Sequence, residues 1–312
     1  MKKLLNAATV LMEGAALLAI PVFAQAENQG QGQAVVTVLP AHGNEMPASL
    51  TSQDLTLKVN GKDSTITNFT PLRGINDRLE LVIMMDSGAR TSLGTQLGEV
   101  REFVKNLPSG SKVTLAYMEN GVARLTGPLS TDHDQVLKGL HLPAGYPGAD
   151  ASPYFCLSNL AKNWPSSDRS ARREVVMISD GVDYYDARYD PQDPYMESAI
   201  ADSVRAGVVV YSIYWENRGR FDRSRWGNFA GQNLLLEVTQ ATGGNSYWQG
   251  MGNPVSFRPF LQDIQRRLQN QYEVSFTAPL KNKPEVGSLK LKVNGISGKV
   301  DAPGEVYVVR SM

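Results

Sequence analysis

Residues 79–88 read LELVIMMDSG, and residues 173–181 read REVVMISDG. Each stretch is an apolar run that ends on an aspartate with a glycine close behind it. Continuous apolar runs of this kind are typical of strands that are buried on both faces of a parallel α/β sheet. Such sheets hold ligands at the carboxyl ends of their strands, because the loops that leave those ends meet there. The two stretches therefore predict a parallel sheet with a functional site at its carboxyl edge.

The chain between about residues 79 and 271 alternates apolar runs with helical periodicity. This pattern is typical of strands and crossover helices around a parallel sheet. The runs 175–178 and 208–214 are rich in β-branched residues and fit central strands, and Asn-Gly at 120–121 predicts a hairpin. Helices are predicted over 93–107, 132–140, 152–163, 195–206, 229–241 and 254–270, and short strands over 113–118, 122–125 and 245–248.

The two flanks of this segment have a different texture. Residues 34–70 and 272–310 contain short alternating runs broken by Gly, Pro and Asn, which is typical of antiparallel strands. LTLKVNG at 55–61 and LKLKVNG at 289–295 agree at six of seven positions. We expect the flanks to pack together as one small β-rich unit with the α/β domain inserted in it, since the ends of compact domains often lie close together. The predicted boundaries are 27–75, 76–271 and 272–312.

The N-terminus has the pattern of a secretory signal peptide. Residues 1–26 begin with Met and two lysines, continue through an apolar run, and end with the small-residue pattern Ala24-Gln25-Ala26. The alternative is a membrane anchor or a buried helix, which Gly14, Pro21 and the short apolar length oppose. We expect cleavage near Ala26 and export to the periplasm or beyond, with no membrane span in the mature chain.

Charge and cysteine content restrict the function. Without residues 1–26 the chain keeps 29 basic and 30 acidic residues, since two lysines and one glutamate are lost. This balance gives no case for nucleic-acid binding. Cys156 is the single cysteine, so export does not come with an internal disulfide framework. Its apolar neighbours predict a small buried side chain and not a reactive thiol.

The order of elements resembles the von Willebrand factor type A domain, and more specifically the bacterial secreted proteins described as VWFA-related. The motifs that carry the resemblance are Asp-Ser-Gly at 86–88, a Gly-rich segment at 145–150 and Ser-Asp-Gly at 179–181. The domain would cover about 79–271, and with the β-rich flanks and the Gln271-Tyr272 exit from the last helix the resemblance covers most of the mature chain. It implies a Rossmann-like fold, with a mostly parallel central sheet and helices on both faces.

In that family a divalent cation is held by an Asp-x-Ser-x-Ser loop, by a Thr from a second loop, and by the Asp of a Thr/Ser-Asp-Gly turn. Mg²⁺ requires near-octahedral oxygen donors, which thioether and methyl groups cannot replace. Either alignment of the first loop leaves two of its three ligand positions without a suitable donor. The residues at those three positions are Met85, Ser87 and Ala89 in one alignment, and Asp86, Gly88 and Arg90 in the other.

The second-loop position falls near Asp150 or Ser152, and only Asp180 matches its family position cleanly. We therefore predict a degenerate metal site, in which Asp86, Ser87 and Asp180 are the residues that could still contact a cation. If Asp86, Asp150 and Asp180 converged, they would form a carboxylate-rich site better suited to Ca²⁺. The alternative for Asp180 is a turn residue before the following glycine.

Two loops expected at the same edge carry side chains that concentrate in protein interfaces. Residues 180–193 contain five aspartates and three tyrosines, and residues 216–226 contain four arginines, Phe221 and Trp226. Tyr, Trp and Arg bury large areas at low entropic cost. The alternative is that the acidic and basic loops simply pair with each other. The residues expected to contact a partner are Asp183, Tyr184, Tyr185, Arg218, Arg220 and Trp226.

The sequence lacks the common catalytic and nucleotide-binding motifs, including Gly-x-Ser-x-Gly, His-Glu-x-x-His, Gly-x-x-x-x-Gly-Lys and Gly-x-Gly-x-x-Gly after a strand. We predict an exported, non-enzymatic module that binds a protein partner through the carboxyl-edge loops, with no cofactor and no working metal site. The alternatives are a Mg²⁺- or Ca²⁺-dependent adhesion domain that uses Asp86 and Asp180, an envelope hydrolase with paired carboxylates, and an envelope scaffold without a discrete ligand.

Overall fold

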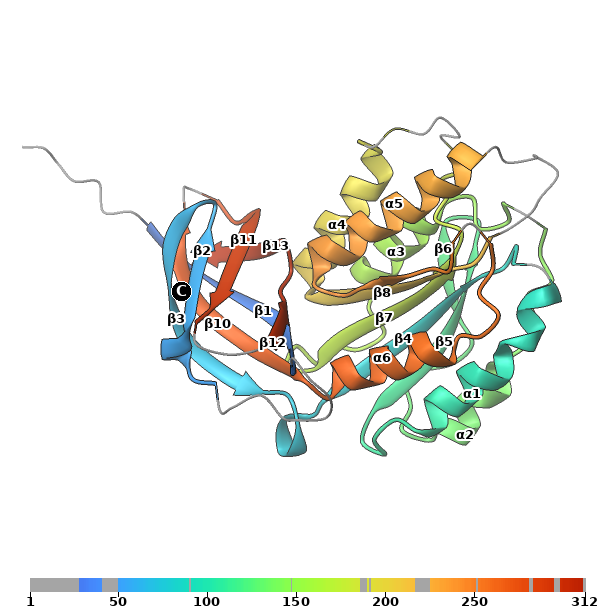
Figure 1. Cartoon of the computed structure of the whole chain (residues 1–312), viewed down its shortest axis with the longest axis horizontal. Coiled ribbons are helices and arrows are strands. Elements are labelled where there is room, and N and C mark those ends of the chain that lie inside the picture. Colours follow the sequence, from blue (N-terminus) through green and yellow to red (C-terminus); the bar gives the residue numbers. More distant parts are fainter. Residues whose placement is uncertain are drawn as a thin grey trace, which may run out of the picture.

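The structure is a computed structural model with two parts, an α/β domain and a β-rich domain (Figure 1). It describes residues 28–40, 50–89, 91–146, 148–185, 190, 192–216, 225–250, 252–280, 283–294 and 298–310.

In these residues, six strands form the α/β sheet in the order β6-β5-β4-β7-β8-β9. All neighbours are parallel except the hairpin of β5 and β6. Every residue of β4 and of β7 is buried, as expected for strands with both faces covered. The strands are β4 (Leu79–Asp86), β5 (Lys112–Glu119), β6 (Val122–Leu125), β7 (Arg172–Ser179), β8 (Val208–Tyr214) and β9 (Ser246–Tyr247).

Helices cover both faces of this sheet (Figure 1), because successive side chains of each strand point to opposite sides. Ile83 packs with the helices of one face and Met84 with those of the other. The predicted fold class, a mostly parallel sheet with helices on both faces and a β-rich flank, is confirmed. One face holds α1 (Leu97–Lys105), α2 (His133–Val136) and α6 (Arg258–Leu268), and the other holds α3 (Pro153–Lys162), α4 (Pro194–Ala206) and α5 (Arg225–Thr242).

Some helix boundaries differ from the prediction. The segment predicted as one helix over 93–107 is a 3-10 turn followed by α1, and the segment 132–140 is α2 followed by a second 3-10 turn. Gly94, Gly98 and Gly139 lie in or beside these breaks, and glycine weakens a helix interior. Helix α6 starts later than predicted, with Pro259 in its first turn. The 3-10 segments are η1 (Ser52–Asp54), η2 (Gly74–Asn76), η3 (Thr91–Thr95) and η4 (Leu137–Gly139).

The β-rich domain joins the two ends of the chain in one antiparallel sheet. Its order is β10-β3-β2-β11-β13-β1-β12, and β1 also pairs with β10, so six of its strands close on themselves. The repeated segments at 55–59 and 289–293 are neighbours, with Leu57 opposite Leu291. The strands are β1 (Asn28–Pro40), β2 (Leu55–Val59), β3 (Lys62–Pro71), β10 (Gln271–Leu280), β11 (Glu285–Val293), β12 (Gly298–Asp301) and β13 (Glu305–Arg310).

Two connections join the domains, one before β4 and one between α6 and β10, and Arg172 ties them together. Its guanidinium donates to the carbonyl of Leu268 at 2.7 Å and to Oε1 of Gln271 at 2.5 Å on one connection, and it pairs with Asp77 at 2.7 Å on the other. No helix in the described parts of the chain is both long and apolar enough to cross a membrane.

Candidate functional site

Four buried aspartates lie at the carboxyl edge of the α/β sheet. Asp86 ends β4, and Asp180 directly follows the adjacent strand β7; each is 1% exposed. Asp150 lies before α3 and Asp183 lies two residues beyond Gly181, and both are buried. The sequence-based expectation that residues from these two strand ends occupy one edge therefore agrees with the parallel pairing of β4 and β7.

The backbone of the first loop is fixed by hydrogen bonds. Oδ1 of Asp86 accepts the amide N–H of Gly88 at 2.7 Å, and the carbonyl of Ser87 accepts the N–H of Gly145 at 2.9 Å. Ser87 thus connects the loop after β4 to the Gly-rich segment. Met85, which one alignment placed at a ligand position, is fully buried in the core under α1.

The loop after β7 is built around Asp180. Its Oδ1 accepts the N–H of Val182 at 2.9 Å, and its Oδ2 accepts the hydroxyl of Tyr184 at 3.3 Å. Gly181 takes a φ of +68°, a conformation that favours glycine. Helix α5 approaches so closely that a Cβ on Gly231 would lie 1.9 Å from the Asp180 carbonyl oxygen. Asp180 therefore lies in a turn before Gly181, which is the position that the sequence analysis gave as its alternative.

Two buried side chains near this edge, Tyr154 and Cys156, have raised pKa values. Burial raises the pKa of the Tyr154 phenol well above its ordinary value, and Asp193, Asp180 and Asp183 raise it further. The hydroxyl of Tyr154 stays protonated and donates to the Gly181 carbonyl at 2.6 Å. Burial likewise raises the pKa of the Cys156 thiol, which is fully buried as predicted from its apolar neighbours.

The described carboxylates and hydroxyls at this edge can be compared with the cation site that the family resemblance implies. Among the residues that the structure describes, no group of three or more His, Cys, Asp or Glu side chains could hold a metal ion. Asp86 and Asp180 each have a carboxylate oxygen that accepts a backbone amide of their own loop. Ser87 could supply one hydroxyl, but Ala89 takes the second serine position of the first loop, and the second-loop position falls near Asp150 or Ser152.

The predicted partner-contact residues fall into three groups. Asp183 is buried, and its Oδ1 accepts the N–H of Tyr185 at 2.7 Å, so its carboxylate shapes the loop. Tyr184 is half-buried, with its ring against Gly148. Tyr185 is 63% exposed and packs edge-on against Phe155. Arg218, Arg220 and the side chain of Trp226 lie outside the described residues.

The structure adds exposed apolar side chains that the sequence analysis did not select. Four of them lie in loops, and Phe229 lies near the start of α5. Tyr146 stands in the sequence Gly-Tyr-Pro-Gly at 145–148, a pattern that favours an exposed turn. The exposed side chains are Leu142, Tyr146, Phe229, Trp248 and Val255.

No protein-family model and no curated protein sequence matches this chain. Solved structures with some similarity include an aerotolerance-related membrane protein from Bacteroides fragilis NCTC 9343, with 15% identity and a TM-score of 0.43 over 61% of this chain and 98% of that chain. The pilus adhesin SpaC from Lactobacillus rhamnosus GG has 8% identity and a TM-score of 0.43 over 87% and 49%. The SpRpn10 VWA domain has 11% identity and a TM-score of 0.36 over 60% and 93%.

These values are low, and the fold assignment rests on the chain's own architecture. In the described part of the domain, the central strands β5, β4, β7 and β8 are parallel, β6 forms an antiparallel edge, and three helices lie on each face. The Asp-Ser-Gly and Ser-Asp-Gly turns stand at the ends of two adjacent central strands. Residues 79–271 therefore have a mostly parallel α/β fold with helices on both faces, which is the fold that the resemblance to the von Willebrand factor type A domain implied.

Proposed function

We propose that this chain is a non-enzymatic binding module that holds a protein partner at the carboxyl edge of its α/β sheet, without a bound metal ion. We also propose that it is exported after cleavage near Ala26 and acts in the periplasm or outside the cell. The binding proposal rests on two kinds of residue at this edge. Buried aspartates hold the backbones of the loops, and exposed tyrosine rings project from the same loops.

The buried aspartates share one hydrogen-bond geometry. Three aspartates at the edge each use Oδ1 to accept the backbone N–H two residues further on, at 2.7 to 2.9 Å. This is the side-chain turn that aspartate commonly forms in loops. A carboxylate oxygen engaged in this way holds the backbone of its own loop. The acceptors are Asp86, Asp180 and Asp183, and the donors are Gly88, Val182 and Tyr185.

The exposed rings belong to two tyrosines at this edge. The ring of Tyr185 packs against Phe155 at 5.3 Å between centroids, and the turn of Tyr146 is tied to Ser87 through Gly145. Both rings are well exposed. Aromatic side chains on a fixed backbone lose little entropy on binding, and this is why they dominate protein interfaces.

The test is capture of a partner by the mature chain with a photo-reactive phenylalanine analogue at position 185, followed by affinity measurement with the captured protein. We expect Tyr146→Ala and Tyr185→Ala each to weaken that affinity by roughly tenfold or more, as for interface hot spots. Ile75→Ala is the matched control, because Ile75 is 92% exposed but lies in η2, before the opposite end of β4.

Chelation separates the proposal from the metal-dependent alternative. We expect the affinity to be the same with and without EDTA, and calorimetry to show no tight binding of Mg²⁺, Mn²⁺ or Ca²⁺. Loss of capture in EDTA would contradict the proposal. Turnover of peptidoglycan, ester or peptide substrates that disappears in Asp180→Ala would replace it with the hydrolase alternative.

A further inference from the structure

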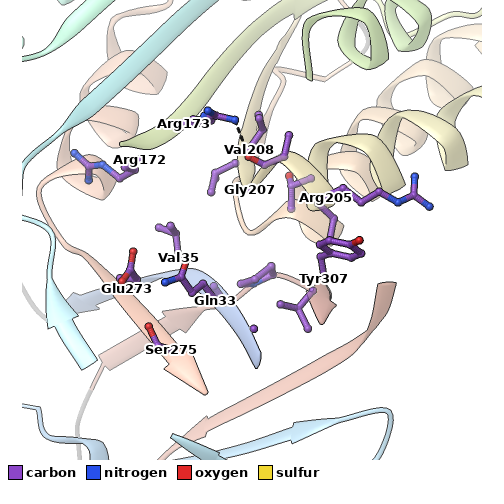
Figure 2. Close-up of a pocket in the computed structure, with 18 of the residues that line it drawn as sticks. Gln33, Val35, Arg172, Arg173, Arg205, Gly207, Val208, Glu273, Ser275 and Tyr307 are labelled. Carbon is purple, nitrogen blue, oxygen red and sulfur yellow. Dashed lines mark hydrogen bonds between the residues drawn. The ribbon is translucent and has the colours of Figure 1, made fainter. Parts of the chain in front are cut away.

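A cleft of about 550 Å³ lies between the two domains, at the end of the α/β sheet opposite the carboxyl edge (Figure 2). The α/β domain contributes the start of β7 and the turn from α4 into β8, and the β-rich domain contributes β1, β10 and β13. Its volume falls in the range of small-molecule sites, which occur preferentially between domains. The cleft is therefore separate from the site of the proposed function.

The α/β wall of the cleft carries the positively charged side chains of Arg169 and Arg173. Arg173 is 5% exposed, and its guanidinium donates only to carbonyl oxygens, those of Ser166 at 3.2 Å and of Ala206 and Asp168 at 3.3 Å. Burial lowers the pKa of Arg173 and the positive charge of Arg169 lowers it further, whereas the carboxylates of Glu80 and Asp168 act in the opposite direction. Within the described chain neither arginine forms an ion pair, so this wall favours an anionic group.

The opposite wall of the cleft carries two glutamates that are likewise outside any described ion pair. Glu273 on β10 and Glu305 on β13 line the cleft and form no ion pair with any residue that the structure describes. Burial raises the pKa of Glu305, and Glu197 on α4 raises it further. The β wall therefore favours a cationic group.

Uncharged hydrogen-bonding groups lie between these charges. Gln33, Ser275 and Tyr307 line the β side of the cleft (Figure 2), and their side chains make no hydrogen bond to the described residues. Together they offer both donors and acceptors. A ligand with alternating amide donors and acceptors along its length would match them.

We propose that this cleft binds a short zwitterionic peptide, with its terminal carboxylate toward Arg169 and Arg173 and its terminal ammonium toward Glu273 and Glu305. The two walls do not neutralise each other, because no described ion pair crosses the cleft. A ligand with opposite charges at its two ends neutralises both walls at once, and its backbone amides supply partners for the polar groups between them.

Four forms of one peptide test this assignment by NMR titration of the mature chain. They are tetra-alanine with free ends, its N-acetyl form, its C-amide form and the form blocked at both ends. We expect the free peptide to bind most tightly and each block to weaken binding by about tenfold, as for loss of one charge-assisted contact. Equal affinities for all four forms, or binding of none, would overturn the proposal.

Two substitutions assign each end of the peptide to its wall. Arg169→Gln should remove the effect of C-amidation and leave the effect of N-acetylation, and Glu273→Gln should do the reverse. Neither side chain is in an ion pair that the fold uses, and circular dichroism verifies folding. Lys290→Gln, an exposed change on β11 away from the cleft, should change neither. Variants that leave both blocking effects intact would refute the proposed orientation.

Discussion

The most informative stability experiment concerns Glu174, a fully buried glutamate on β7. Burial raises its pKa from the ordinary value of 4.5 to about 8, and this outweighs the lowering by Arg172 and Gln271. The attraction of Arg172 is weakened because its guanidinium already pairs with Asp77 at 2.7 Å. Among the residues that the structure describes, neither carboxyl oxygen of Glu174 accepts a hydrogen bond of normal geometry, so the opposing effect of Gln271 is weak. The carboxyl group is therefore protonated in the native state at neutral pH.

The sign of the resulting pH dependence follows from proton linkage. Between the unfolded value of 4.5 and the folded value of about 8, the native state keeps a proton that the unfolded state has lost. The stabilisation from Glu174 is complete below pH 4.5 and is lost as the pH rises toward 8. Each pH unit in this window removes about 1.4 kcal/mol. From pH 5 to pH 7 the expected loss is about 3 kcal/mol.

The assay is urea unfolding of wild type and Glu174→Gln from pH 5 to pH 8, followed by circular dichroism. The amide replaces the protonated carboxyl group without a titration, so the two proteins should match near pH 5 and the variant should gain by about 1.4 kcal/mol per pH unit above it. Glu119→Gln, at an exposed position on β5, controls for the loss of one charge. Parallel stability curves for wild type and Glu174→Gln would refute the reasoning.

Three further predictions use the same unfolding and binding assays. Gly231→Ala should destabilise the protein by more than about 2 kcal/mol, because the new Cβ would overlap the Asp180 carbonyl and must displace α5; an unchanged urea midpoint would contradict this. Arg172→Met should lower stability by roughly 3 kcal/mol, since it leaves Asp77 and Gln271 without their buried partner, whereas a loss below about 1 kcal/mol would show that the clamp is dispensable. EDTA should leave the thermal unfolding temperature unchanged, and a drop would reveal a bound ion.

The parallel sheet could be predicted from the sequence, but the roles of the polar residues at its edge could not. The apolar runs at 79–85 and 175–178 require burial on both faces, and only a helix-covered parallel sheet supplies that environment. The Asn-Gly signal at 60–61 likewise marks a turn, since both residues have positive φ there. Patterns of this kind are local, and a single stretch of chain contains all the information they need.

The carboxyl edge was harder to interpret because an aspartate that binds an ion and an aspartate that caps its own turn look the same in sequence. The hydrogen bonds from backbone amides to Asp86 and Asp180 are visible only in the structure. The cleft could not be predicted at all. Its walls bring together Gln33, Arg173 and Glu273, which belong to three distant segments, and no local pattern marks residues that meet only after two domains pack.

The pairing of β1 with β10 and β13 has a consequence for the order of folding. Strand β1 ends at Pro40, whereas its partners begin at Gln271 and Glu305, so the whole α/β domain lies in the chain between them. Closing so long a loop is entropically slow unless the intervening chain is already compact. We therefore expect the inserted domain to fold first and to bring the two flanking segments together. Under that order, β1 pairs with β10 and β13 only in the last stage of folding.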